Sequence, residues 1–497
     1  MSIAKGHYRV IFIGPFYTGF FMDTAILFNH GYVNFQRDIT KRLREDKNEE
    51  WFIEEDKKGD VVWATEFENI YGGTPIIPPS LVGKNIDLSL TYRKSDDKEN
   101  KETKNKWILD ESSEGNGISV KINRVKLFYH DYGTGTFRIN TELNLPHDIE
   151  VKQYRELIEE FSGEINGFFL NSILEENTKS LMEVIQTIET NFMGEKDISF
   201  PQKITGLFKR NKEDLSRDIL DSFEDMGEEI TTKGLKNISI QTGLWFHRVF
   251  IFELDSEEPI SDDDYKCYRD VLYSSQKMGP QNCSLDEYVR VYPSFNFSLF
   301  LYNKNNKPKD IQLNRLMEIA EYYYAATSLL DIILFNKLIE FKERKNYSPR
   351  IRELKEELED LQQISDQLEL FLLTLKNSII NLSPNSRLMW RNIDTEWYYN
   401  SMLETLEEKN ALIVSKVDSK LEELNQKRSE TLNKFIKIFT LIAIIGPLLE
   451  AYLLLQDLGI IDAIISNLSL FLLVSIPISS IFLLIIVWYL RKLLTEY

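Results

Sequence analysis

Apolar and polar positions change their spacing near residue 310 of this chain. Before it, short stretches in which apolar and polar residues alternate, as in strands, are mixed with stretches of helical spacing. After it the spacing is helical, and the chain is nearly free of glycine until Gly446. We therefore expect an α/β or α+β domain over residues 1–310, followed by long helices.

Within residues 1–310, Gly133-Thr134-Gly135 predicts a hairpin turn between two strands. The alternating stretches predict strands at residues 8–13, 60–64, 86–92, 118–129, 136–143, 244–254 and 290–302. The helical stretches predict helices in part of 24–43, over 151–191 with a glycine break, and over 212–225.

The helical region divides into two parts before its most apolar segment. Residues 311–393 predict two long antiparallel helices, at 313–345 and 350–382, and leucines in the second keep a coiled-coil spacing. Residues 394–434 predict a stalk helix without a breaker, which continues into the apolar segment. A continuous helix from 394 to 455 would extend about 90 Å.

Two apolar segments follow, at residues 435–455 and 468–490. Each is long enough to cross ~30 Å of hydrocarbon, so we expect a two-helix transmembrane hairpin; a pair of buried core helices is the alternative. Basic residues flank both segments on the side of the chain termini, whereas the linker 456–467 has none. The positive-inside rule therefore predicts the cell (inner) membrane as location, with both termini cytoplasmic and the linker external.

The first apolar segment has features of a pore-lining helix. Gly446 and Pro447 would free backbone groups and form a hinge. The predicted pore and gate face, at 3–4 spacing, is Ile438, Ile442, Ile445 and Leu449. The alternative is that this face packs against the second segment or lipid.

Acidic residues predict the outer mouth of such a pore. The candidates are Glu450, Asp457 and Asp462. A lipid-facing carboxylate is costly, which favours a pore position for Glu450, although its side chain can also reach the interface.

Composition excludes several classes of protein. Two cysteines and five scattered histidines argue against a disulfide-stapled domain, a zinc site and a His-rich metalloenzyme. A net charge of −19 argues against a general nucleic-acid partner. Carboxylates of so acidic a chain could hold regulatory Mg²⁺.

No catalytic motif is found, so we do not expect an enzyme. Phe16 and Tyr17, in a Gly-Pro loop after a strand, are candidates for ligand contact, and an ordinary aromatic turn is the alternative. Trp245 and His247 share one strand face and Arg248 takes the other. An aromatic ring and a cation can hold a purine or a phosphate, whereas the alternative is a half-buried strand with polar edges.

The order of an α/β domain, long helices and a two-segment C-terminus, with the segment NKFIKIFTLIAIIGPLLEAYLLL at 433–455, resembles the CorA family of divalent cation channels. The resemblance implies a homopentamer whose first span, with its proline, lines the pore. The family's Gly-Met-Asn signature is absent, and its place reads Gln456-Asp457-Leu458. The magnesium filter is therefore not carried over.

The long N-terminal region is more similar to CorA-like effectors associated with type III CRISPR systems. This resemblance implies a ligand-gated, channel-type membrane effector in antiviral defence, opened by a nucleotide messenger of the S-adenosylmethionine–AMP type. Its partners would be the bilayer, its own copies and that nucleotide. A Mg²⁺ or Co²⁺ transporter with another filter is the first alternative, and a membrane-anchored enzyme or scaffold is the second.

Overall fold

The computed structural model describes the sheet domain and most of the helices. The described residues are 2–21, 32–47, 51–53, 81–95, 106–110, 117–130, 132–193, 243–255, 257–268, 271, 283, 287–304, 310–343, parts of 365–375, and 384–457. The predicted strand 60–64, the predicted helix 212–225, most of the predicted helix 350–382, and the apolar segment 468–490 lie outside them.

The chain forms two compact units. The first comprises Met1–Ile333 with Leu370–Leu406, and the second Leu334–Glu369 with Glu407–Tyr497.

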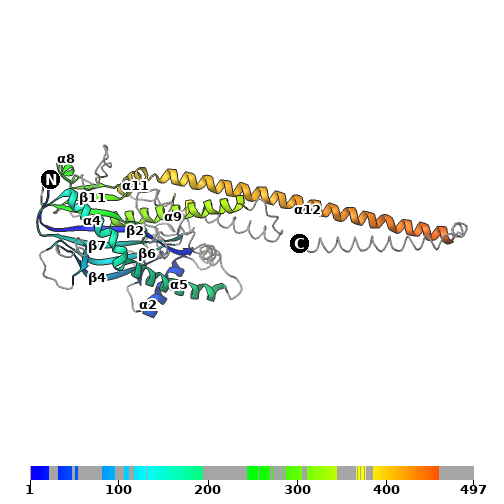
Figure 1. Ribbon diagram of the computed structural model, residues 1–497, viewed down its shortest axis with the longest axis horizontal. Coiled ribbons are helices and arrows are strands. Elements are labelled where there is room, and N and C mark those ends of the chain that lie inside the picture. The colour runs from blue at the N-terminus through cyan, green and yellow to red at the C-terminus, as the bar shows by residue number, and fades with distance from the viewer. Residues whose placement is uncertain are drawn as a thin grey trace. The chain divides into compact units, whose positions relative to one another are not determined.

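A nine-stranded sheet forms the first unit, in the order β10-β11-β9-β2-β7-β6-β4-β3, with β5 on β4 (Figure 1). Its pairs are antiparallel except that β11 and β9 run parallel. The strands are β2 (Gly6–Phe21), β3 (Trp51–Phe52), β4 (Val82–Lys94), β5 (Trp107–Leu109), β6 (Ser119–Tyr129), β7 (Tyr132–Leu145), β9 (His247–Leu254), β10 (Val289–Tyr292) and β11 (Phe297–Asn303). A separate small pair joins β1 (Ser2–Ile3) to β8 (Ile149–Glu150).

The helices of this unit lie before, between and after these strands. They are α2 (Tyr32–Lys47), α4 (Val151–Ile165), the π-helical η1 (Asn166–Leu170), α5 (Asn171–Met193), α8 (Asp262–Tyr268), most of α9 (Asp310–Glu343), α11 (Pro384–Trp397) and the start of α12 (Tyr399–Asp457). The expected glycine break in 151–191 is η1, through which the helix continues.

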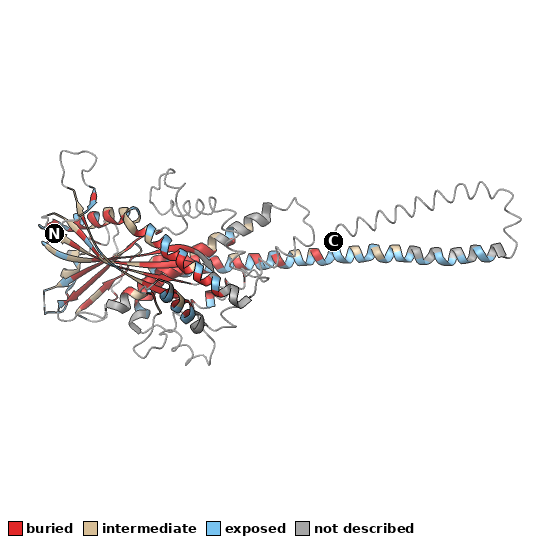
Figure 2. Ribbon diagram, turned by 90° about the horizontal axis from the view of Figure 1, so that it is seen from below, coloured by how far each residue is buried: buried red, intermediate tan, exposed pale blue. Residues whose placement is uncertain are grey.

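One face of the sheet holds the apolar core, and α4 covers it. Alternation along β2 turns Val10 and Phe12 to this face, where both are fully buried. Phe161 of α4 packs against Phe12, with ring centroids 6.1 Å apart, and Tyr154 packs against Phe250 at 5.6 Å. Figure 2 shows the buried colour running along the strands and the helix faces that pack on them.

The N-terminal half of α9 covers the opposite face. Glu318 of α9 pairs with Arg138 of β7, and Glu321 accepts a hydrogen bond from Trp245. The Trp397 indole, at the end of α11, donates to the carbonyl of Ser294 at 3.1 Å. This face therefore contacts its helices through polar groups as well as rings.

In the second unit, α12 continues as one helix to Asp457 with Pro447 inside it. Ile413, Val417 and Leu424 are buried, whereas Phe439 is 67% exposed. The ammonium of Lys409 lies 5.4 Å from the ring centroid of Phe335.

The expected C-terminal membrane hairpin of a CorA-like fold is wrong. Within the described part of the chain, no helix has a long enough apolar run to cross a membrane. The predicted first span, 435–455, belongs to α12. The chain is a mixed α/β fold with a large sheet.

Alanine substitutions at two glycines test the packing of the first unit. A Cβ at Gly14 of β2 would lie 2.1 Å from the Trp245 carbonyl oxygen and 2.6 Å from the Phe137 ring. A Cβ at Gly163 of α4 would meet nothing within 4 Å. We predict that Gly14→Ala lowers the free energy of unfolding by about 2 kcal/mol or more, because backbone must move.

The matched control, Gly163→Ala, is expected to raise the free energy of unfolding by roughly 0.5–1 kcal/mol, because it removes a helix-interior glycine. Urea denaturation followed by circular dichroism measures both. Equal stability of the two variants would contradict the described contact between β2 and Trp245.

Candidate functional site

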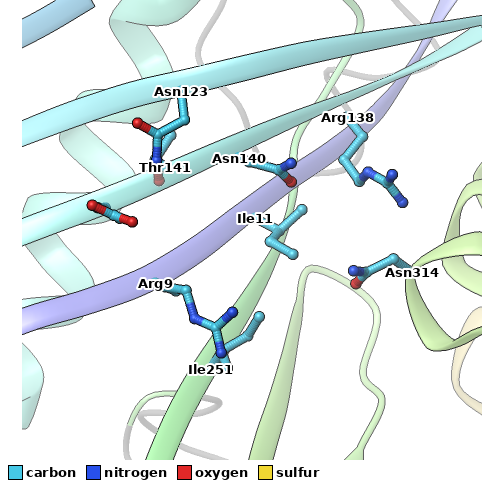
Figure 3. A pocket seen from close by; sticks show the side chains of 9 residues that line it. Arg9, Ile11, Asn123, Arg138, Asn140, Thr141, Ile251 and Asn314 are labelled. Atoms are coloured by element: carbon cyan, nitrogen blue, oxygen red, sulfur yellow. The ribbon is translucent and has the colours of Figure 1, made fainter. Parts of the chain in front are cut away.

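A cavity of about 260 Å³ opens on the sheet face that α9 covers (Figure 3). Strands β2, β6, β7 and β9 and the N-terminal part of α9 contribute to it. Its lining residues are Arg9, Ile11, Asn123, Arg138, Asn140, Thr141, Glu142, Ile251 and Asn314.

Strand alternation and register bring these side chains together. Arg9 and Ile11 are two residues apart on β2 and therefore share a face. In the antiparallel register Arg9 lies opposite Glu142, and Ile11 lies opposite Asn140. Arg138 precedes Asn140 by two residues, so three consecutive positions of one face of β7 line the pocket.

The pocket combines charge with hydrogen-bonding groups. Its lining holds two guanidinium groups and one carboxylate. The side-chain amides of Asn123, Asn140 and Asn314 have no hydrogen-bond partner among the described residues. Buried Ile11 and Ile251 supply an apolar surface. A few directed polar groups on an apolar wall are typical of small-molecule sites.

Arg138 links the pocket to α9. Its Nη1 lies 2.7 Å from Oε1 of Glu318, which is fully buried. Arg315 donates to the other oxygen of Glu318 at 3.2 Å. The Arg315 guanidinium lies 4.5 Å from the ring centroid of Phe128 on β6. One carboxylate thus contacts two arginines, one from the sheet and one from its own helix.

Arg9 is positioned by β11 and β9. Its Nη2 donates to the hydroxyl of Tyr302, and that hydroxyl donates to Glu253 at 3.0 Å. The Arg9 guanidinium also lies 5.9 Å from the Tyr302 ring centroid. These contacts fix the guanidinium at one wall of the pocket.

A second polar cluster surrounds Glu321, one turn along α9. Trp245 Nε1 donates to Glu321 Oε2 at 2.7 Å, and His247 Nδ1 lies 3.7 Å from Oε1. His247 Nδ1 contacts the Phe295 carbonyl at 3.1 Å, and Nε2 contacts the Ser298 hydroxyl at 2.8 Å. These partners assign the ring proton to Nδ1, because a carbonyl can only accept.

Both titratable groups of this cluster are neutral near pH 7. Burial lowers the pKa of His247 to about 3, and the Phe295 hydrogen bond opposes that shift. Burial raises the pKa of the Glu321 carboxyl to about 8, and the Trp245 hydrogen bond opposes it. The contact of 3.7 Å is therefore one between neutral groups, not an ion pair.

The ligand candidates predicted from sequence lie outside the pocket lining. Phe16 and Tyr17 are buried, and Phe16 packs edge-on against Tyr129 at 5.4 Å. Trp245 and His247 share a face as expected and meet at Glu321. Arg248 takes the opposite face, where its Nη2 donates to the Ser162 hydroxyl at 2.7 Å.

The predicted pore residues belong to α12 as far as they are described. Ile438 is partly exposed, and Gly446, Pro447 and Glu450 are exposed within the helix. The backbone of α12 passes through Ile442, Ile445, Leu449 and Asp457, whose side chains lie outside the description, as does all of Asp462. Among the described residues, no group of histidines, cysteines or carboxylates could hold a metal ion.

Sequence reasoning missed the pocket, although part of its pattern is visible. Arg9 with Ile11, and Arg138 with Asn140 and Glu142, have the period-two spacing of a common strand face. The pairing of β2 with β7 places the Arg9 face of one strand beside the Arg138 face of the other. This pairing cannot be predicted from the spacing within each strand.

Comparison with known proteins yields one distant structural neighbour. No family model matches the chain, and no curated protein matches it. The solved structure of the full-length CmaX protein aligns over 43% of this chain and 77% of its own, with 13% identity and a TM-score of 0.21. A likeness this weak carries no argument about fold or function, so the resemblance to CorA-like effectors stays a prediction.

The Glu321 carboxyl predicts a specific pH dependence. Its pKa is raised from 4.5 to about 8, so between these values the folded protein binds more protons than the unfolded chain. Stability contributed by this group therefore falls as pH rises through that window. Glu321→Gln cannot titrate, so we expect its free energy of unfolding to improve relative to the wild type as pH rises.

The change is expected to approach ~1.4 kcal/mol per pH unit at its steepest. Urea denaturation of both proteins at several pH values between 5 and 8 measures it. A difference that stays constant across this range would show that the buried carboxyl does not titrate there.

Proposed function

We propose that this protein is a ligand-responsive effector whose sheet domain binds a small anionic ligand of the nucleotide type. The observation that carries the proposal is the double position of Arg138, which lines the pocket and also pairs with buried Glu318 of α9. A ligand that contacts Arg138 acts on the helix that leaves the sheet domain.

The anionic character of the ligand follows from the charges. Arg9 and Arg138 outnumber the single carboxylate of Glu142 in the lining. Guanidinium groups bind carboxylates and phosphates in bidentate, charge-assisted hydrogen bonds, which are stronger than neutral ones.

The nucleotide class is supported by the remaining lining groups. Asparagine amides can pair with the edge of adenine, and a carboxylate such as Glu142 can accept from ribose hydroxyls. The cavity volume of about 260 Å³ is slightly below the ~300–1,000 Å³ of typical ligand pockets. It suits one nucleotide unit, which makes the AMP half of an S-adenosylmethionine–AMP conjugate a suitable candidate.

The output of the effector rests on sequence resemblance alone. A channel-type antiviral effector, a Mg²⁺ or Co²⁺ transporter, and the predicted bilayer and self partners remain predictions. Ion flux from lipid vesicles carrying the full chain separates the two outputs. Flux that requires the conjugate favours the effector, and Mg²⁺ flux without nucleotide favours the transporter.

Calorimetric titration of the full chain with the S-adenosylmethionine–AMP conjugate, AMP and S-adenosylmethionine tests the binding step. We predict that the conjugate and AMP bind, and that Arg9→Gln weakens their affinity about tenfold or more, a loss of ~1.4 kcal/mol. The cause is the loss of one charge-assisted contact to phosphate.

Arg290→Gln is the matched control. It removes the same charge from β10, at the far edge of the sheet, where Arg290 pairs with Asp262 at 2.6 Å. Its affinity should stay within about twofold of the wild type. Absence of binding by all three compounds, or equal losses in the two variants, would contradict the proposal.

A further inference from the structure

We infer that the anionic group of the ligand displaces Glu318 from Arg138, and that this exchange releases the first turns of α9 from the sheet. The inference rests on the proposed function, because it assigns the regulation of the same pocket. It is carried by the cluster formed by Arg138, Arg315 and Glu318.

The cluster lies in a largely buried place. The Arg138 and Arg315 side chains are 11% and 13% exposed, and Glu318 is fully buried. Glu318 contacts both arginines. A buried guanidinium left without an anion is costly, so an incoming anion beside Arg138 can take the place of the carboxylate there.

Glu318 does not lose every partner in this exchange. Arg315 lies three residues before it on the same helix and contacts its second oxygen at 3.2 Å. Removing one partner of a buried ion pair is strongly destabilising, because a charge is left alone. Here each guanidinium keeps one anion: the ligand on Arg138 and Glu318 on Arg315. Exchanging Glu318 for a ligand anion on Arg138 therefore costs less free energy than breaking the ion pair with no replacement.

The position of Glu318 on α9 couples the exchange to the helix. Asn314, Glu318 and Tyr322 follow at intervals of four residues and share one helix face. Asn314 lines the pocket, and Tyr322 stacks on His130 of the sheet domain with centroids 3.9 Å apart. Between these two points α9 contacts the sheet through the ion pair of Glu318 with Arg138 and through the Arg315 guanidinium over the Phe128 ring.

Contacts farther along α9 limit how much of the helix is released. The bond from Trp245 to Glu321 and the stack of Tyr322 on His130 do not involve the pocket. The exchange is therefore expected to loosen residues 310–320 while the later turns stay packed.

Hydrogen exchange measured by mass spectrometry on the full chain, with the S-adenosylmethionine–AMP conjugate as probe, tests the inference. In the wild type, we expect the conjugate to speed exchange of the amides over residues 314–320 by about threefold or more. Strands β2 and β7 should be protected at the same time.

The variant Glu318→Gln distinguishes the release of α9 from the binding of the ligand. Its exchange over 314–320 should already be fast without the probe, and calorimetry should show tighter binding, by about threefold or more, because no carboxylate competes for Arg138. Glu318→Asp, whose shorter side chain weakens the contact but keeps the charge, should lie between Glu318→Gln and the wild type. Glu318→Asp replaces Glu318→Gln in both measurements if Glu318→Gln does not fold.

Glu321→Gln is the matched control, because it changes a buried glutamate of the same helix that does not contact Arg138. It should keep the response of the wild type. Wild-type binding without faster exchange, or a Glu318→Gln affinity equal to the wild type, overturns the inference and leaves the proposed function standing. If the wild type binds neither the conjugate nor AMP, both fall.

Discussion

The buried ion pair between Arg138 and Glu318 is the contact on which the ligand pocket and the helical region jointly depend. It joins the central part of the sheet to the third turn of α9, with 2.7 Å between the charged atoms. A buried pair of this kind is weak evidence for added stability, because desolvation offsets much of the attraction. It does define where α9 lies on the sheet, since separating the two groups without a replacement anion would leave the Arg138 guanidinium alone. Arg138 and Asn314 line the pocket beside the ion pair, so the ion pair also fixes the position of this part of the pocket lining.

The next turn of the same helix meets the sheet in a different way. Glu321 and His247 are both neutral near pH 7, because burial raises the pKa of the first and lowers that of the second. An anion that enters the pocket can compete with the Glu318 carboxylate for the Arg138 guanidinium. The contacts of Glu321 are between neutral groups, so the anion does not compete with them. The two adjacent turns thus have separate roles: one can respond to a ligand, and the other anchors the helix.

Local patterns predicted much of the sheet and little of the site. The alternation at 8–13, 118–129 and 136–143 was confirmed as β2, β6 and β7, because strands with one apolar face carry a period of two. The segment 290–302 instead forms two strands, β10 and β11, separated at 293–296. The expected membrane hairpin was wrong, because no helix among the described residues is long and apolar enough to cross a membrane. The pocket was missed because it needs the register of β2 against β7, strands separated by more than a hundred residues in sequence.

A high-resolution structure of the full chain with the S-adenosylmethionine–AMP conjugate bound tests the central claim most directly. The predicted result places a phosphate of the ligand within about 3 Å of the Arg138 and Arg9 guanidinium groups, at charge-assisted hydrogen-bond distance. It also places Glu318 on Arg315 alone, with its distance to Arg138 beyond the ~4 Å of an ion pair. A ligand bound elsewhere, or an occupied pocket with the contact between Arg138 and Glu318 still at 2.7 Å, would contradict it.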